Sequence, residues 1–268
     1  MSDFKLMILA STPEDALSAQ EAGVDRVFYD LEYIGKSERQ RGRDTVKYHN
    51  DINDIPKLRK VVSSSDLLVR TNPIHPYTPS EVEKAIEYGA DILMLPMVMD
   101  KHDVETYVGL VKGRARVCIM IETAASMTRL DDILATPGVD EIFVGLNDLH
   151  ISLGLNFLFE PMAGGLLDFI ANKCQKKGIP FGFGGIARIG DGILPADMIL
   201  GEHVRLGSTS VILSRTFKGG DSPIAIDFAS EVKKVRTRYE ELQFWTPEQL
   251  EQNRQSVKSI VNKIVYHE

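Results

Sequence analysis

The segment DILMLPMVMDKHDVETYVGLVKGRARVCIMIET, residues 91–123, contains two short apolar runs separated by a helical pattern. The runs at 91–97 and 116–123 have the length and aliphatic composition of buried strands. Between them, residues 100–113 place apolar and charged side chains at helical spacing. The segment therefore predicts one strand–helix–strand unit with parallel strands.

The same unit repeats along the chain. Apolar runs begin near residues 66, 91, 116 and 141, a regular spacing of about 25 residues that suits one strand and one helix. Eight units favour an α/β fold that closes as a (β/α)8 TIM barrel, built by residues 1–245 as a single domain. An open, doubly wound sheet is the alternative, because a sequence does not show closure. The other four strands are predicted at 5–11, 25–32, 180–186 and 208–217.

Length and composition limit the class of protein. The 268 residues are 43% hydrophobic and 26% charged, which is ordinary for one globular domain. A net charge of −7 disfavours nucleic acid as a partner, and no apolar stretch approaches the roughly 18 residues of a membrane span. Acids on both sides of the first apolar run do not suit a signal peptide, so we expect a cytoplasmic protein. Cys118 and Cys174 lie in apolar segments, which predicts buried, reduced thiols.

Residues 246–268 predict one more helix after the barrel, with Thr246 and Pro247 in the first positions and Gln249 near the capping-box position. We expect that the barrel offers no further surface for the apolar stripe of this helix to cover. The helix should therefore pack on a neighbouring subunit or across the barrel bottom, which predicts a homo-oligomer. The stripe consists of Leu250, Val257, Ile260, Val261 and Ile264.

Polar residues gather where the predicted strands end. In a barrel these ends meet at one mouth, where active sites are built. Carboxylates so close together repel one another unless a cation lies among them, and no Cys/His set with zinc-like spacing accompanies them. A divalent ion with oxygen ligands, Mg²⁺ or Mn²⁺, is the simplest solution, and a ring of salt bridges between strand ends is the alternative. The residues are Asp30 and Glu32, Arg70 and Asn72, Glu122, and Asn147 and Asp148.

Several of these residues belong to longer motifs. The stretches FYDLE, LLVRTN, ILMLPMV, IMIETAASM and PGVDEIFVGLNDLHISLGL occur in this order between about residues 5 and 217. In order and spacing they resemble the class II pyruvate aldolase and citrate lyase beta-subunit family of the phosphoenolpyruvate/pyruvate TIM barrels. The most specific part is IET followed by PGVDEIFVGLNDLHISLG.

The resemblance implies a role for most residues of the mouth. Glu122 and Asp148 match the two metal-binding carboxylates. Arg70 matches the arginine that binds the carboxylate or enolate oxygen of a pyruvate or acyl unit, and Asn72 beside it is a candidate substrate ligand. The remaining matches are Asp30 and Glu32, which hold metal-bound water or orient catalytic groups, and Gly145, Leu146 and Asn147, whose backbone lines the substrate carboxylate.

Two positions depart from the family pattern. Tyr33 stands where the aldolases have a histidine base, and Met120 stands where they have a glutamine. We therefore expect metal-bound water, held by Asp30 and Glu32, to act as the base, with His49 as the second candidate. His75 is a further candidate from a loop, and His150 could support the metal site. No strand end offers an obvious inward lysine.

Two further segments could bind an anion. The interval from the second strand to the third is about 41 residues long, and that from the sixth to the seventh is about 40. The first carries a basic stretch, either a solvated loop or a clamp for a phosphate, a CoA-like group or a carboxylated substrate. The glycine-rich stretch 182–192 follows the seventh strand, where barrels often bind phosphate, and Arg188 could meet an anion or a neighbouring acid. The basic stretch comprises Lys36, Arg39, Arg41, Arg43 and Lys47.

These observations favour a divalent-metal-dependent carbon–carbon lyase of the aldolase type that acts on a small oxo-acid or acyl substrate. Cleavage beside a carbonyl leaves an enolate, which a Lewis acid and an arginine can stabilise. The alternatives are a metal-dependent thioester hydrolase, an enolate transferase on the same barrel, or a non-catalytic binding or assembly subunit.

Overall fold

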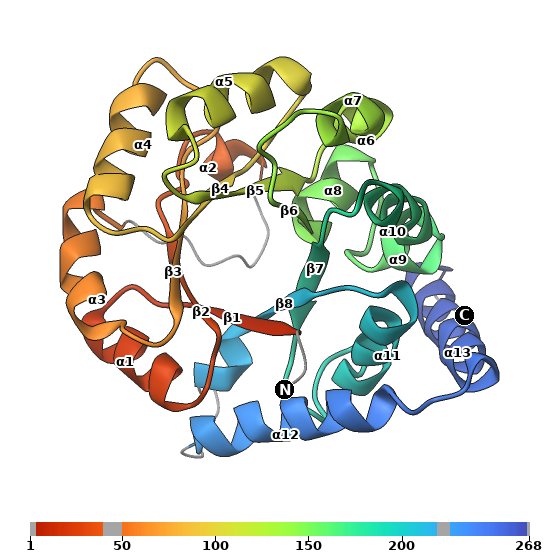
Figure 1. Cartoon of the computed structure of the whole chain (residues 1–268). Helices are drawn as coiled ribbons and strands as arrows, with labels where there is room; N and C mark the ends of the chain where they lie inside the picture. Colours follow the sequence, from red (N-terminus) through yellow and green to blue (C-terminus); the bar gives the residue numbers. More distant parts are fainter. Residues whose placement is uncertain (1–3, 40–49, 219–225, 267–268) are drawn as a thin grey trace.

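The structure is a computed structural model, and it describes residues 4–39, 50–218 and 226–266. Eight parallel strands pair in chain order, and the last pairs with the first, so the sheet is a closed barrel (Figure 1). The expected (β/α)8 barrel is confirmed. The strands are β1 (Lys5–Leu9), β2 (Arg26–Asp30), β3 (Asp66–Arg70), β4 (Ile92–Leu95), β5 (Arg116–Ile121), β6 (Glu141–Val144), β7 (Phe181–Ile186) and β8 (Ser210–Leu213).

The helices form a ring around the barrel, and local signals set their ends. In α1 the Thr12 hydroxyl accepts the Asp15 N–H at 3.2 Å, Pro13 opens the first turn, and Gly23 follows the end with φ +82°. The ring comprises α1 (Pro13–Glu21), α3 (Ile55–Val61), α4 (Thr78–Glu87), α5 (Lys101–Val111), α6 (Ala124–Thr128), α7 (Leu130–Leu134), α10 (Leu166–Lys177), α11 (Ala196–Leu206) and α12 (Phe228–Leu242). None of the helices in the described ranges is long and apolar enough to cross a membrane.

The two long intervals carry extra elements. Between β2 and β3 lie α2 (Lys36–Arg39) and η1 (Ile52–Asp54), and between β6 and β7 lie α8 (Leu146–Ser152) and α9 (Glu160–Ala163). A short helix η2 (Arg215–Lys218) follows β8. Helices α2 and α8 start within a few residues of a strand's carboxyl end, so the insertions add side chains to the barrel mouth.

Strand alternation divides the barrel interior into layers. On β2 the residues that point inward are Arg26, Phe28 and Asp30, from the amino end of the strand to its carboxyl end. The middle layer is an apolar plug, which separates the two charged ends. It consists of Met7, Phe28, Leu68, Ile92, Met94, Cys118, Met120 and Phe143. Cys118 and Cys174 are both buried free thiols, as predicted.

The lower layer is closed by ion pairs. Arg26 Nη1 lies 2.8 Å from Glu141 Oε2 across the barrel floor, and both side chains are buried. Arg116 pairs with Asp66 at 2.6 Å beside them. These ion pairs and the apolar plug above them fill this end of the barrel, so we look for a ligand site at the opposite, carboxyl end of the strands.

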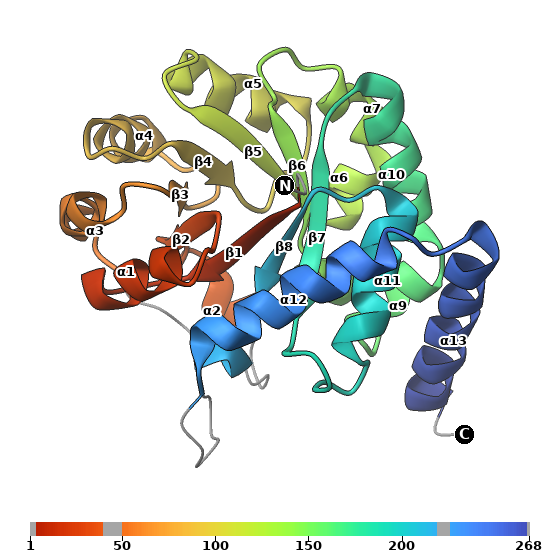
Figure 2. The ribbon, with the colours of Figure 1, turned by 60° about the horizontal axis from the view of Figure 1, so that its bottom comes forward.

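The last helix, α13 (Pro247–Tyr266), corrects the expectation that the barrel has nothing for it to cover. It lies outside the ring along α11 and α9, with Val257 and Val261 buried (Figure 2). Asn253 Nδ2 donates to the Met198 carbonyl at 3.0 Å, and Gly201 has no side chain to block this approach. The rest of the stripe (Leu250, Ile260 and Ile264) is half-buried. A subunit interface at this helix, and a homo-oligomer, therefore stay predictions.

The floor ion pair can be tested by a double-mutant cycle. Arg26→Met should lower the free energy of unfolding by about 3–5 kcal/mol, because it leaves the Glu141 carboxylate buried without a partner. Adding Glu141→Leu should restore most of that loss. Urea unfolding followed by circular dichroism measures both, and a double variant no more stable than Arg26→Met would contradict the pairing.

Candidate active site

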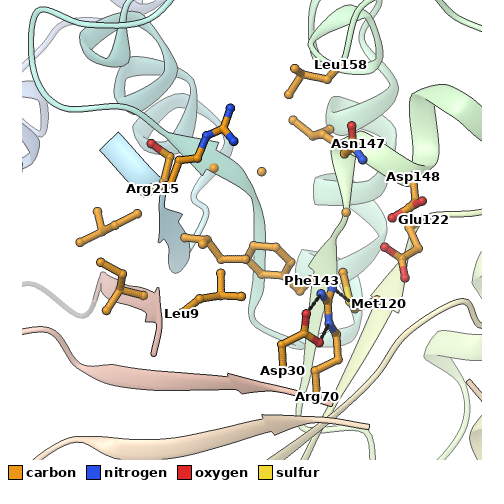
Figure 3. Close-up of a pocket in the computed structure, with 18 of the residues that line it drawn as sticks. Leu9, Asp30, Arg70, Met120, Glu122, Phe143, Asn147, Asp148, Leu158 and Arg215 are labelled. Carbon is orange, nitrogen blue, oxygen red and sulfur yellow. Dashed lines mark hydrogen bonds and ion pairs between the residues drawn. The ribbon is translucent and has the colours of Figure 1, made fainter. Parts of the chain in front are cut away.

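A cavity of about 400 Å³ opens at the carboxyl ends of the strands. One side carries charged groups, among them Asp30, Arg70 and Glu122, and Arg215 lies across the cavity from them (Figure 3). The remaining walls are largely apolar. They include Leu9, Phe143, Leu146, Leu158 and Ile212, with Gly184 and Gly185 from β7.

A two-pronged ion pair joins β2 and β3 at the cavity. Arg70 Nε and Nη2 donate to Asp30 Oδ1 and Oδ2, each at 2.8 Å, and the guanidinium lies 5.2 Å from the centre of the Phe28 ring. Burial would raise the pKa of Asp30, but the charges and hydrogen bonds of Arg70 and Lys36 outweigh it and hold that pKa well below its usual range. Arg70 Nη2 also lies 3.4 Å from Glu32 Oε2, so Asp30 and Glu32 face the same way, as the sequence predicted.

Helix α2 inserts two more cations among the acids. Lys36 Nζ lies 2.8 Å from Asp30 Oδ2 and 3.5 Å from Glu32 Oε2. Arg39 bridges Glu32, at 2.5 Å, and Asp148, at 3.3 Å. Lys36 and Arg39 therefore neutralise the acids of the mouth and do not project as the expected anion clamp.

This arrangement also corrects the charge argument for a metal. With four carboxylates and a single arginine, a divalent ion was the simplest solution and a ring of salt bridges the alternative. The structure supplies three cations of its own, Arg70, Lys36 and Arg39. Four of the predicted residues, Arg41, Arg43, Lys47 and His49, lie outside the described residues.

Glu122, just beyond β5, differs from the other acids of the mouth, which all form salt bridges. Within the described residues no basic side chain forms a salt bridge with it, and its Oε1 accepts the Met97 N–H at 2.8 Å. Met97 adopts φ +55°, a left-handed conformation that is unusual for methionine. Burial, with the nearby charges of Glu32 and Asp148, raises the pKa of Glu122 to about 8. Glu122 is therefore the acid of the mouth that gains most from an added cation.

Gly145 gives the Glu122 carboxylate its space. A Cβ atom at this position would lie 2.3 Å from Glu122 Oε2. The Gly145 N–H donates to the Ile121 carbonyl at 3.2 Å, so this amide is not turned to a ligand as the sequence had suggested. Leu146 and Asn147, in the first turn of α8, do line the cavity.

Asn72 does not line this cavity, although it follows Arg70 on the chain. Its Oδ1 accepts the N–H groups of Tyr33 and Ile34 at 3.0 and 3.1 Å, and its Nδ2 donates to Glu81 at 2.7 Å. The predicted substrate ligand is therefore an internal brace, which holds the turn between β2 and α2.

Tyr33, His75 and His150 also lie away from the charged mouth. The Tyr33 side chain is 62% exposed and borders a second hollow together with His75, whose Nδ1 lies 3.1 Å from Thr78 Oγ1. His150 is buried in α8, where its Nδ1 lies 3.2 Å from the Leu146 carbonyl oxygen. None of the three lines the cavity that holds Arg70.

The glycine-rich stretch after β7 contains Arg188, which we expected from the sequence to meet either an anion or a neighbouring acid. Arg188 pairs with Asp191 at 2.8 Å, so its partner is a neighbouring acid. Gly184 and Gly185 border the cavity. Sequence reasoning named Lys36 only as part of a basic stretch, and it missed Arg215 as a cavity residue. The signal for Lys36 was its place four residues after Glu32, the spacing of an (i, i+4) ion pair.

Glu122 and Asp148 are the side chains that could share a hard cation. Over the described ranges, no three His, Cys, Asp or Glu side chains converge as a metal site. Glu122 and Asp148 nevertheless line one cavity, and Glu122 forms no salt bridge among the described residues. This donor set fits Mg²⁺ or Mn²⁺, which often take only one or two carboxylates and leave further positions to water and substrate.

The fold and this mouth define a class of protein. A model of the HpcH/HpaI aldolase/citrate lyase family matches residues 4–158, more than half of the chain. The chain therefore belongs to the HpcH/HpaI aldolase/citrate lyase family, in agreement with the resemblance of its motifs.

One curated relative is the hydroxypyruvate/pyruvate aldolase of Rhizorhabdus wittichii, with 33% identity over 145 residues. The alignment covers 41% of this chain and 58% of that protein, so the chain spans less than two thirds of its relative's length.

Solved structures share the fold at low identity. A family protein from Burkholderia cenocepacia J2315 is 18% identical, with a TM-score of 0.62 over 90% of this chain and 95% of the other. The citrate synthase SbnG is 17% identical, with a TM-score of 0.64 over 89% and 95%. At this identity the likeness concerns the fold alone.

The space beside Glu122 can be tested with two glycine variants. Gly145→Ala should lower the free energy of unfolding by about 1–3 kcal/mol, because the new methyl group overpacks the carboxylate. Gly109→Ala is the control, since a Cβ there meets nothing within 4 Å and alanine favours helix α5 by up to about 1 kcal/mol. Equal urea midpoints for the two variants would contradict the tight fit.

Proposed function

We propose that this chain is a divalent-metal-dependent aldolase that makes or breaks a carbon–carbon bond next to a small 2-oxo acid. The observation that carries the proposal concerns one side of a cavity whose other walls are largely apolar. There a fixed guanidinium, Arg70, lies near Glu122, a buried carboxyl that forms no salt bridge among the described residues. This arrangement can bind a carboxylate and an enolate oxygen at one end and an acceptor at the other.

Arg70 is oriented to bind an anion. Arg70 Nε and Nη2 donate hydrogen bonds to the Asp30 carboxylate. The remaining group, Nη1, lies 3.7 Å from Met120 Sδ, which is a weak acceptor. The Nη1 group can therefore exchange this sulfur contact for a substrate carboxylate or enolate oxygen. Methionine at the family glutamine position fits the same role, because it does not compete strongly for the arginine.

Glu122 and Asp148 would hold the metal. When bound, a divalent ion supplies a Lewis acid beside the oxo group, which lowers the cost of forming an enolate. Arg39 shares Asp148, so the ion and this guanidinium compete for one carboxylate. The backbone of Leu146 and Asn147 then borders the site of the oxo acid.

The relative in Rhizorhabdus wittichii supports the choice of substrate class. Its name describes an aldolase of hydroxypyruvate and pyruvate, and both are small 2-oxo acids. The cavity volume of about 400 Å³ accommodates such an acid together with a small acceptor.

The activity is tested by pyruvate release from a panel of 4-hydroxy-2-oxo acids, with and without Mn²⁺. Arg70→Lys should lower kcat/KM at least about a hundredfold, because lysine cannot keep the two-pronged contact with Asp30 while binding the substrate. Arg188→Lys, which alters a pair outside the cavity, should change it less than about twofold. Hydrolysis of acyl thioesters without any pyruvate release would contradict the proposal.

The metal site is tested by isothermal titration calorimetry with Mn²⁺. Glu122→Gln and Asp148→Asn should each weaken binding at least about tenfold, because each removes a charged ligand. Arg39→Met should strengthen binding, because Asp148 loses its competing cation. Glu105→Gln, at an exposed position of α5, serves as the control. Unchanged affinity in both ligand variants would rule out this site.

A further inference from the structure

We infer that Lys36 is the catalytic acid–base group of the aldol step, an inference that rests on the proposed function. The family histidine position holds Tyr33, and its side chain is mostly exposed beside another hollow. Lys36 lines the cavity itself, and its side chain is only 9% exposed. It is the first basic residue after β2, and its side chain lines the cavity.

The lysine is placed next to the proposed substrate end. Lys36 Nζ and Arg70 Nη2 each lie 2.8 Å from the same atom, Asp30 Oδ2. The ammonium group is therefore a near neighbour of the guanidinium that would hold the oxo acid. An acceptor oxygen one or two bonds from the enolate carbon falls within reach of such a group.

The chain between β2 and α2 is built to deliver this side chain. The Asn72 amide fixes the N–H groups of Tyr33 and Ile34, and Gly35 turns the backbone with φ +72°. A residue with a Cβ atom adopts this conformation at a cost, so glycine suits the position. The turn directs Tyr33 outward and Lys36 inward.

The charged groups around Lys36 favour a proton donor over a nucleophile. Asp30 and Glu32 face its nitrogen, while Arg70 and Arg39 bind the same two carboxylates from other sides. Lys36 Nζ donates to Asp30 Oδ2 at 2.8 Å, which places its N–H bonds among oxygen acceptors and suits proton transfer more than attack on a carbonyl carbon. We therefore assign Lys36 to proton transfer and not to Schiff-base formation.

The step can be written with its atoms balanced. In the addition direction the enolate carbon bonds to the aldehyde carbon, and the carbonyl electron pair moves to the aldehyde oxygen. Lys36 gives one proton to that oxygen, which becomes a hydroxyl group, and the resulting amine regains a proton from water. Cleavage reverses these transfers.

Two reactions separate this role from enolate formation. Decarboxylation of oxaloacetate yields the same enolate but removes no hydroxyl proton. Cleavage of a 4-hydroxy-2-oxo acid requires both the formation of the enolate and the removal of the hydroxyl proton. Lys36→Arg keeps the positive charge but exchanges protons poorly. It should lower cleavage at least about a hundredfold and change decarboxylation less than about threefold. Lys57→Met, at an exposed position, should change neither reaction.

Chemical rescue gives an independent readout. Lys36→Cys treated with 2-bromoethylamine regains an amine on a side chain of similar length, and both native cysteines are buried. Cleavage should recover at least about tenfold while decarboxylation stays constant.

Three results would overturn the inference: full cleavage activity in Lys36→Arg, equal loss of both reactions in that variant, or borohydride trapping of pyruvate on Lys36. The proposed function fails differently, with a wild-type protein that neither releases pyruvate nor decarboxylates oxaloacetate.

Discussion

The ion pair between Asp30 and Arg70 is the interaction on which the barrel mouth depends. Its two 2.8 Å hydrogen bonds fix the guanidinium at the carboxyl ends of β2 and β3. The same carboxylate anchors Lys36, and Glu32 beside it anchors Arg39, so one pair of strand ends orders three cations. A buried carboxylate with such partners is costly to disturb, because any partner that leaves exposes a charge in a medium of low polarity.

Strand alternation explains how this charged layer coexists with a stable barrel. Inward positions on β2 run from Arg26 through Phe28 to Asp30, so an apolar plug separates a sealed ionic floor from an open ionic mouth. Electrostatic interactions in the mouth are strong because the plug below it excludes water. Glu122 is the acid of this layer that forms no salt bridge among the described residues. Burial, with the charges of Glu32 and Asp148, raises its pKa although Arg70 lowers it.

Local rules predicted the parts of the molecule that depend on local chemistry. Strand ranges follow from apolar runs, the start of α1 from Thr12, and the shared direction of Asp30 and Glu32 from alternation. The sequence did not reveal that the Asn72 amide braces a turn, or that Lys36 points inward, since both depend on where the chain returns in space. Helix α13 shows the same limit. The apolar stripe of this helix can be predicted from the sequence. Its contact with α11 cannot, because that contact depends on the space that Gly201 leaves for Asn253.

The central claim is that one side of the cavity binds the carboxylate and enolate oxygens of a 2-oxo acid. A crystal structure with Mn²⁺ and oxalate, a stable mimic of the pyruvate enolate, tests it most directly. We expect an oxalate carboxylate on Arg70 Nη1, an ion held by Glu122 and Asp148, and Arg39 displaced from Asp148. Oxalate bound instead in the hollow beside Tyr33, or an ion held by other residues, would contradict it.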